Sequence, residues 1–430
     1  MESLWTKTGR LPSFDPLPGD LRTDVLVIGG GMAGLLCAYR LTEAGVDCAL
    51  VEADRICGGV TKNTTAKITS QHGLIYHRLI REFGPERARL YLEANQSALA
   101  AYRELCREID CGFEERDAAV YATGSRRKID RERGALERLG FTGAFSARAP
   151  VPAAGAVGFR RQAQFHPLKF AAAIAGGLRI FEHTKVLELG PGTAVTNRGT
   201  VSAERIIAAT HFPLLNRHGG YFLKLCQHRS YVLALENAPG PEGMFVDESG
   251  KGLSFRSCGE LLLLGGGGGR TGKRCGGWRE LEAFARERWP EARVAARWAA
   301  QDCMTLDGVP YVGQYSRNTP RLYVATGFNK WGMTSSMAAA ALLRDLILGR
   351  DNPYTELFSP ARTALRPRLA VNGWEAAAGL LTPTAPRCPH MGCALKYNAR
   401  EHSWDCPCHG SRFGEDGRLL DNPATDGKDL

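Results

Sequence analysis

A glycine-rich turn near the N-terminus separates an apolar run from a segment with helical periodicity. Residues 24–29 (DVLVIG) are apolar and rich in β-branched side chains, which predicts a buried parallel strand. Residues 32–44 have helical periodicity, Gly45 follows as a stop signal, and residues 46–52 (VDCALVE) predict a second strand. Together these segments predict a β-α-β unit and therefore an α/β fold with a parallel sheet.

The glycines of this turn are spaced as in a dinucleotide-binding site. Gly29, Gly31 and Gly34 match G-x-G-x-x-G, and Glu52 stands at the end of the second strand. The first glycine permits the tight turn, the second lets the backbone approach a pyrophosphate, and the third lets the helix contact the strand closely. Glu52 can accept hydrogen bonds from a ribose. This context favours a dinucleotide site over a glycine turn without a ligand, but it does not distinguish FAD from NAD.

Further segments favour FAD. Residues 20–350 resemble the glycine oxidase and D-amino-acid oxidase family of FAD-dependent oxidoreductases, on residues 52–59 (EADRICGG), 63–67 (NTTAK), 305–313 (TLDGVPYVG) and 324–333 (VATGFNKWGM). The resemblance implies a Rossmann-type FAD-binding domain with an interleaved α+β substrate domain. It adds the following residues to Gly29, Gly31, Gly34 and Glu52 as FAD-binding positions: Arg55, Gly58, Gly59, Thr65, Ala66, Lys67, Val186, Thr210, Gly327, Trp331, Gly332 and Met333.

A second glycine run, residues 265–269, is not expected to bind a nucleotide. The position three after Gly267 is Arg270, so the G-x-G-x-x-G pattern fails, and no helix is predicted to follow. We expect a loop or a β-turn here. With a single dinucleotide fingerprint, an NAD(P)H-linked reductase is the less favoured class.

Four of the thirteen cysteines crowd into a short segment near the C-terminus. Residues 388–393 are CPHMGC and residues 406–411 are CPCHGS, so that C-x-H and C-x-x-H are separated by fifteen residues. Two cysteines and two histidines can bind zinc in a tetrahedral site, and that alternative stays open. The spacing is not a common zinc pattern, which favours a different metal centre.

This pattern resembles the Rieske iron–sulfur family. The resemblance implies that Cys388 and Cys406 bind one iron of a [2Fe–2S] cluster, and that His390 and His409 bind the other. Two imidazoles in place of two thiolates remove negative charge, which raises the reduction potential to roughly −150 to +300 mV. Such a centre can accept electrons from a reduced flavin.

The remaining two cysteines, Cys393 and Cys408, fall where many members of the Rieske family have a disulfide. The resemblance therefore implies a disulfide between them. Free thiols are the alternative, since disulfides are unusual in a reducing cytosol. The chain before Cys388 is short and shows little strand alternation, so a shortened module that has lost its cluster is a further alternative.

The domain organisation follows from a change in composition. Residues 351–368 contain three prolines and little periodicity, which is typical of a linker. We expect an FAD-dependent oxidoreductase domain over residues 1–350, a linker over 351–375 and a small, β-rich and shortened Rieske domain over 376–430.

Composition constrains location and partners. The first twenty residues are polar and interrupted by proline, unlike a signal peptide, and no stretch approaches the roughly 18 apolar residues of a membrane span. We therefore expect a cytoplasmic protein. The net charge is +10, but Lys and Arg are scattered among acids, so nucleic-acid binding is not expected.

These features predict an oxidoreductase that acts on CH–NH donors. A small amine or amino acid would be oxidised at the flavin, and electrons would leave through the cluster to an unknown acceptor. Candidates for the substrate pocket are Lys67, His72 and Lys330. Two alternatives stay open: an electron-transfer protein that serves a protein partner without a small organic substrate, and a binding protein that retains empty redox folds.

Overall fold

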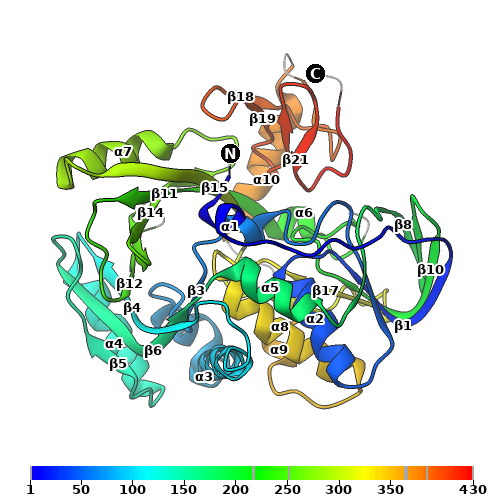
Figure 1. Cartoon of the computed structure of the whole chain (residues 1–430), viewed down its shortest axis with the longest axis horizontal. Helices are drawn as coiled ribbons and strands as arrows, with labels where there is room; N and C mark the ends of the chain where they lie inside the picture. Colours follow the sequence, from blue (N-terminus) through cyan, green and yellow to red (C-terminus); the bar gives the residue numbers. More distant parts are fainter. Residues whose placement is uncertain (1, 216–217, 250–251, 363–366, 384–385, 429–430) are drawn as a thin grey trace.

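Two lobes, each built on its own β-sheet, lie side by side beneath a small C-terminal module drawn in orange and red (Figure 1). This computed structural model describes residues 2–215, 218–249, 252–362, 367–383 and 386–428.

The first lobe contains a mostly parallel sheet of eight strands. Strands β10, β1, β2, β7 and β17 are parallel, whereas β16 pairs antiparallel with β17 and the β8–β9 hairpin extends from β10. The strands are, in spatial order, β16 (Tyr311–Gln314), β17 (Leu322–Thr326), β10 (Thr200–Ala208), β1 (Leu21–Ile28), β2 (Cys48–Val51) and β7 (Arg179–Phe181), with β8 (Val186–Gly190) and β9 (Thr193–Thr196) beside β10.

The predicted β-α-β unit is present in this lobe. The second half of β1 and all of β2 are buried, as expected for strands covered on both faces. Helix α2 (Met32–Glu43) connects them and ends just before Gly45, which has a φ of +79°. Two further helices contact α2, namely α8 (Gly332–Ile347) and α5 (Pro167–Ala175). The main hydrophobic core includes these helices and the sheet, and it continues into the second lobe, where Ile129 and Phe159 belong to it.

The second lobe is built on a nine-stranded sheet that is largely antiparallel. Helices α4 (Arg126–Arg138) and α7 (Gly277–Arg288) pack on strands of this sheet, and α3 (Tyr76–Leu105) contacts both α4 and α8 of the first lobe. The strands are, in spatial order, β15 (Arg293–Thr305), β11 (Leu225–Glu236), β14 (Leu261–Arg270), β13 (Ser254–Cys258), β12 (Met244–Asp247), β4 (Glu114–Ala122), β6 (Gly155–Gln164) and β3 (Lys67–Ile68), with β5 (Ala144–Ser146) beside β6.

The prediction of a loop or β-turn over residues 265–269 was wrong. This glycine run is the second half of β14, where Gly265 pairs with Val232 of β11 and Gly266 with Tyr231. Backbone pairing on both sides of β14 overrides the low intrinsic preference of glycine for strands. Glycine inside a strand marks a place where a ligand or another backbone comes close, and three of these glycines line the large cavity of the molecule.

The C-terminal module is a small four-stranded antiparallel sheet with its own apolar core. Its strands are β18 (Lys396–Asn398), β19 (Ser403–Asp405), β20 (Arg412–Gly414) and β21 (Leu419–Asp421). The expected linker is partly helical, because it contains α9 (Thr355–Phe358) and the first part of α10 (Pro367–Leu381). Residues 363–366 of that linker lie outside the described residues.

A buried ion network attaches this module to β11 of the second lobe. Glu401 of the module accepts from Arg229 Nε at 3.0 Å, from Arg412 Nη2 at 3.0 Å and from the Tyr231 hydroxyl at 2.9 Å. The side chains of Arg229, Arg412 and Glu401 are all less than about one-eighth exposed. Because a buried charge without its partner is costly, this network fixes the module against the second lobe.

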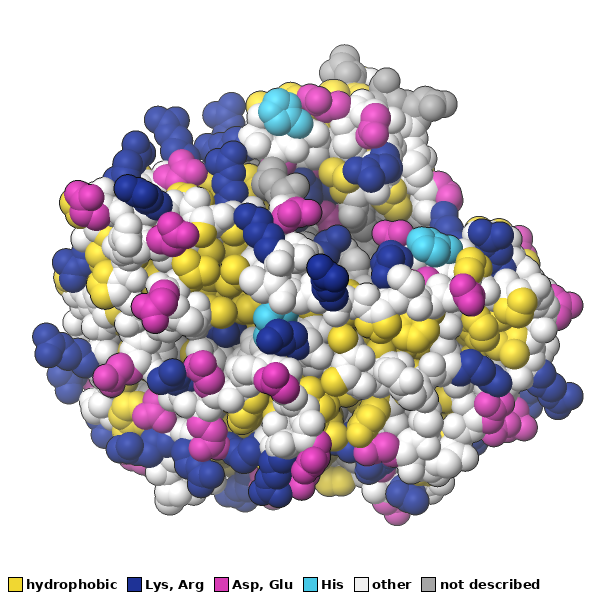
Figure 2. Space-filling model, in the orientation of Figure 1, with side chains coloured by type: hydrophobic (Ala, Val, Ile, Leu, Met, Phe, Trp, Pro, Cys, Tyr) yellow, Lys and Arg dark blue, Asp and Glu magenta, His cyan; other side chains and the backbone are white. Residues whose placement is uncertain are grey.

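The remaining short elements complete the surface. They are α1 (Leu4–Thr8), η1 (Val60–Asn63) and α6 (Tyr221–Lys224). Lys and Arg are interspersed with Asp and Glu over the face in Figure 2. Among the described residues, no helix combines the length and the apolar character that a membrane crossing requires.

Candidate functional site

The three glycines of the fingerprint have the geometries expected of them. Gly29 follows β1 with a φ of +105°, a conformation that favours glycine. A Cβ on Gly34 would lie 1.8 Å from the Gly29 carbonyl oxygen, so α2 can approach β1 this closely only with glycine there. A Cβ on Gly31 would meet nothing nearer than Thr61 Oγ1, at 3.6 Å. The turn therefore leaves space beside the N-terminus of α2, where a pyrophosphate is expected to bind.

Glu52 lies directly after β2, as predicted. Its Oε2 accepts from the Gly30 N–H at 2.7 Å, and its Oε1 accepts from the Asp54 N–H at 3.0 Å. Loss of hydration raises the pKa of Glu52, and these two hydrogen bonds oppose that rise. The carboxylate thus holds the glycine turn in place at the edge where the ribose is expected.

A cavity of about 790 Å³ begins at this turn and reaches the second sheet. It follows the carboxyl ends of the parallel strands, where ligands of open α/β sheets usually bind. The predicted FAD-binding residues in its wall are Gly29, Gly31, Glu52, Gly58, Gly59, Thr65, Lys67, Val186, Thr210, Trp331, Gly332 and Met333.

Four predicted FAD-binding residues lie outside the lining of this cavity: Gly34, Arg55, Ala66 and Gly327. The first packs on Gly29, as described. Arg55 is turned toward Glu182, with Nε 2.9 Å from Oε2. Ala66 and Gly327 have φ angles of +53° and +73°, so they shape the backbone behind the wall. We expect these four positions to support the site rather than contact its ligand.

Lys67, a candidate for the substrate pocket, lies in the cavity wall with its side chain buried. Its Nζ donates to Ser254 Oγ at 2.5 Å. Burial, together with the nearby charge of Arg256, lowers the pKa of Lys67 to about 7. A lysine with such a pKa exchanges a proton near neutral pH, which suits a general base.

His72, a second candidate, has both ring nitrogens engaged. Nδ1 lies 2.6 Å from the Tyr91 hydroxyl and Nε2 lies 2.7 Å from the Thr69 carbonyl oxygen. Its ring stacks on Trp331 with centroids 5.0 Å apart. Burial lowers the pKa of His72 to about 3, so the imidazole is neutral at pH 7. This residue is therefore suited to position Trp331 and not to transfer a proton.

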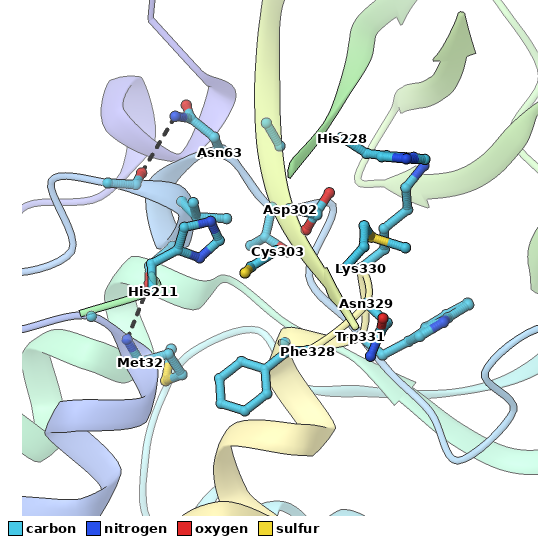
Figure 3. Close-up of a pocket in the computed structure, with 18 of the residues that line it drawn as sticks. Met32, Asn63, His211, His228, Asp302, Cys303, Phe328, Asn329, Lys330 and Trp331 are labelled. Carbon is cyan, nitrogen blue, oxygen red and sulfur yellow. Dashed lines mark hydrogen bonds between the residues drawn. The ribbon is translucent and has the colours of Figure 1, made fainter. Parts of the chain in front are cut away.

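Lys330, the third candidate, faces the cavity together with an acid that the sequence analysis missed (Figure 3). That acid is Asp302 on β15. Loss of hydration raises the pKa of Asp302, while the charges of Lys330 and His211 oppose the rise. Burial lowers the pKa of Lys330, and the charge of Asp302 opposes that fall. Asp302 is the one acidic residue of β15, and this was the signal in the sequence that could have pointed to this position.

The two predicted ligand loops of the C-terminal module have the same backbone hydrogen-bond pattern. In the first loop, the Cys388 N–H donates to the Cys393 carbonyl at 2.8 Å; in the second, the Cys406 N–H donates to the Ser411 carbonyl at 2.8 Å. The fifth position of each loop is a glycine with a positive φ, +75° and +97°. The loops are thus a matched pair of tight turns.

The four predicted metal ligands meet in like pairs. The thiols of Cys388 and Cys406 contact each other, and the rings of His390 and His409 lie at 83° with centroids 4.9 Å apart. Thiolate with thiolate and imidazole with imidazole is the grouping that the two irons of a Rieske cluster require.

The histidines have the properties of metal ligands. Burial lowers the pKa of His390 to about 3 and that of His409 to about 4, so both imidazoles are neutral. Among the described residues, His409 Nδ1 is buried without a hydrogen-bond partner. A buried polar atom of this kind normally has a partner, and an iron would supply one. The donor set therefore fits the cluster.

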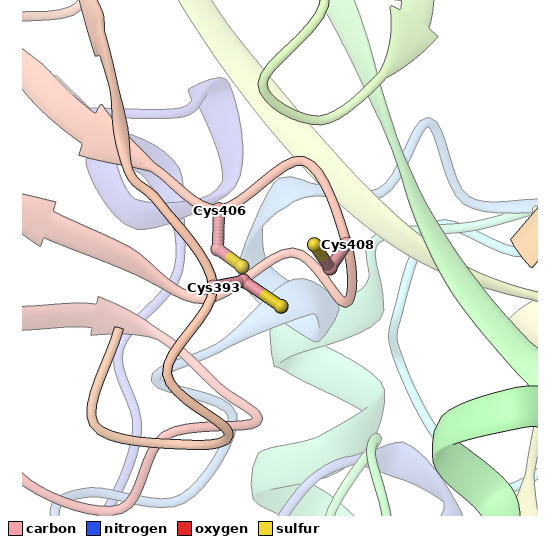
Figure 4. A group of neighbouring side chains, drawn as sticks. All are labelled: Cys393, Cys406 and Cys408. Carbon is pink, nitrogen blue, oxygen red and sulfur yellow. The ribbon is translucent and has the colours of Figure 1, made fainter. Parts of the chain in front are cut away.

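The disulfide implied between Cys393 and Cys408 is not formed, and both residues are free cysteines. Their sulfurs and that of Cys406 lie within 4.8 Å of one another (Figure 4). The Cys408 thiol donates instead to the Glu375 carbonyl of α10, at 3.3 Å.

The cavity and the ligand loops are in contact. Phe212, which follows β10 and lines the cavity, lies edge-on to the ring of His390 with centroids 5.8 Å apart. Gln227 of β11 donates from Nε2 to the His409 carbonyl at 3.2 Å. Residues 419–425 of the module also line the cavity. Sequence reasoning missed these residues, because docking of the module onto the lobes leaves no local pattern.

Comparison with known proteins gives a match to the two lobes and a second match to the C-terminal module. The family described as FAD dependent oxidoreductase matches residues 24–346, and the Rieske [2Fe-2S] domain matches residues 370–428. A relative from Bacillus subtilis, a putative Rieske 2Fe-2S iron-sulfur protein YhfW, is 34% identical over 98% of this chain and 96% of its own length.

Two more distant matches cover the flavin lobes. The gamma-glutamylputrescine oxidoreductase of Escherichia coli is 24% identical over 78% of this chain and 86% of its own length. The crystal structure of glycine oxidase from Geobacillus kaustophilus has a TM-score of 0.65 at 22% identity, over 80% of this chain and 99% of that one. The latter shows that the two lobes share the fold of glycine oxidase.

Proposed function

Because the chain belongs to the FAD dependent oxidoreductase family and carries a Rieske [2Fe-2S] domain, we propose that it oxidises a small amine or amino acid and passes the electrons to the cluster. The substrate carbon loses a hydride and its nitrogen a proton, and water hydrolyses the resulting imine to a carbonyl compound and ammonia or an amine. When bound, FAD supplies the hydride acceptor and the cluster a one-electron acceptor.

The observation that carries this proposal is the contact between Phe212 and His390. One side chain lines the predicted flavin cavity and the other is a predicted iron ligand, and their rings meet without an intervening layer of protein. The buried ion network around Glu401 holds the two parts in this arrangement. Electrons therefore have a direct route from the cavity to the cluster site.

The side chains of the cavity suit an amine. Hydride transfer requires the neutral amine, and Lys67, with its pKa lowered to about 7, can accept the ammonium proton. Asp302 offers a carboxylate that can hold a cationic substrate group by a charge-assisted hydrogen bond. The relatedness to gamma-glutamylputrescine oxidoreductase, named for an amine, supports the same substrate class.

The alternative is an electron-transfer protein that takes electrons from an acidic protein partner, which the net charge of +10 favours. Anaerobic titration of the purified holoprotein separates the two functions. We expect that a member of a panel of small amines and amino acids bleaches the flavin absorbance. Bleaching by a reduced ferredoxin-like protein, with none by any amine in the panel, would support the alternative.

A further inference from the structure

The C-terminal segment, residues 419–426, crosses the wall of the flavin cavity. It begins with β21 and continues past the last strand of the Rieske module. Residues 419–425 line the cavity, although they lie in the sequence after all the cluster ligands. A stretch of the iron–sulfur module thus forms part of the wall of a cavity whose other walls belong to the two lobes.

One end of the segment is tied to the strand ends of both lobes. Asn422 Nδ2 donates to the carbonyl oxygen of Thr210, a predicted FAD-binding residue, at 2.6 Å. The Asn422 carbonyl accepts from Gln227 Nε2, also at 2.6 Å. The same Gln227 amide group donates to the His409 carbonyl of the second ligand loop. Asn422 is therefore held between the flavin cavity and the cluster site.

The other end lies at the far side of the cavity. Lys185 Nζ donates to the Thr425 carbonyl at 2.5 Å and forms an ion pair with Asp426. Lys185 and Val186 both line the cavity, and Val186 is a predicted FAD-binding position. The segment therefore runs along the cavity from Thr210 to Lys185.

Between Asn422 and Thr425, a contact with the second ligand loop fixes the path of the segment. The Ala424 N–H donates to Ser411 Oγ at 3.0 Å, and both residues are buried. Ser411 closes the second ligand loop through its carbonyl. The segment is thus pre-organised before a ligand arrives, which reduces the entropic cost of binding.

We propose that the C-terminal segment is a binding wall for FAD, so that the flavin site is complete only when the Rieske module is docked. Asn422 and Thr425 are then FAD-site residues contributed by the iron–sulfur module. This inference rests on the proposed placement of FAD in the cavity, and it is independent of the substrate.

The test measures how tightly full-length holoprotein holds FAD in the variant Asn422→Ala. This change removes the hydrogen bond to Thr210 and leaves the backbone contact with Gln227 in place. We expect the FAD dissociation constant, measured from the fluorescence of released FAD, to rise about tenfold, since one hydrogen bond is worth about that factor. Glu415→Gln, an exposed residue of the same module outside the cavity lining, serves as the matched control and should leave the constant unchanged.

A second variant guards against misfolding of the module. Gln227→Leu lies on β11, outside the cavity lining, and removes the tether between Asn422 and His409. Both variants are compared with wild type at equal iron content and with an intact Rieske EPR signal. FAD dissociation constants within about twofold of wild type for both would overturn the inference. A wild-type protein that binds no FAD would instead refute the proposed function, so the two failures are distinguishable.

Discussion

The ring of Phe212 meets the ring of His390 edge-on, with centroids 5.8 Å apart and planes at 80°. Phe212 belongs to the flavin lobe and His390 to the first ligand loop of the Rieske module. The wall of the predicted flavin cavity and the first predicted ligand loop are therefore already in contact.

Replacement of Phe212 by Leu should slow electron transfer from the flavin to the cluster. Leu keeps the apolar contact but removes the ring edge that faces His390. We expect the rate of cluster reduction, followed by stopped-flow absorbance after anaerobic flavin reduction, to fall several-fold. The matched control is Phe222→Leu, since Phe222 contacts His409 with ring centroids 6.3 Å apart but does not line the cavity. Equal rates in both variants and wild type would show that Phe212 is not on the route.

Lys67→Met should remove the pH dependence of kcat/KM for the amine near pH 7. In the wild type, kcat/KM for the amine should rise as pH increases through about 7, because Lys67 loses its proton there and becomes able to accept one. We expect the variant to be about 100-fold slower at pH 8 and to lack this rise. An unchanged pH profile in the variant would exclude Lys67 as the base.

The strand–turn–helix unit and the ligand loops were predictable because each is local. The roles predicted for Gly29, Gly34, Cys388 and His390 rest on neighbours within a few residues, and such spacing is visible in the sequence. The glycine run of β14 was not predictable in the same way. Its strand conformation comes from pairing with β11 and β13, which are distant in sequence.

Gly31→Ala and Gly34→Ala should have different effects. At Gly34 a Cβ would lie 1.8 Å from a carbonyl oxygen, so we expect both the melting temperature and FAD content to fall. At Gly31 the Cβ has space in the protein alone and would collide only with a bound pyrophosphate. We therefore expect Gly31→Ala to keep its melting temperature and lose FAD. Thermal denaturation with FAD quantification checks this, and full FAD content in Gly31→Ala would contradict the placement of the pyrophosphate.

Single Cys→Ser variants should identify the iron ligands. Cys388→Ser should lose the cluster, because Cys388 belongs to the predicted ligand set. Cys393→Ser and Cys408→Ser should retain iron and the Rieske EPR signal, because these two thiols are free and are not needed as ligands. Iron analysis and EPR provide the measurement. Loss of the metal in the last two variants, with retention in the first, would favour the three-sulfur group with Cys406 as the metal site.

Arg229→Met should weaken the attachment of the Rieske module. Burial alone would raise the pKa of Glu401, but the charges of Arg229 and Arg412 lower it to about 2. Since its unfolded value is about 4.3, the network stabilises the fold above that pH, and the stabilisation is lost as pH falls toward 2. We expect a loss of about 3 kcal/mol at pH 7, which diminishes between pH 4 and 2. Arg87→Met, which removes an exposed ion pair with Glu356, should change stability little.

The parts of the site that sequence reasoning missed depend on contacts between segments that are distant in the sequence. Phe212 follows β10, Asp302 lies on β15 and Asn422 follows β21, and all three line one cavity. The contacts of Phe212 with His390 and of Asn422 with Thr210 form only because the module packs against the lobes. The direction of the Cys408 thiol toward α10 likewise depends on how a helix within the expected linker packs against the ligand loop.

The most direct test of the account is freeze-quench EPR of the holoprotein after anaerobic mixing with an amine that bleaches the flavin. We predict that the signal of the reduced Rieske cluster grows as the flavin absorbance changes, at a rate independent of protein concentration, because the transfer is intramolecular. A reduced flavin beside a cluster that stays oxidised throughout would contradict the account.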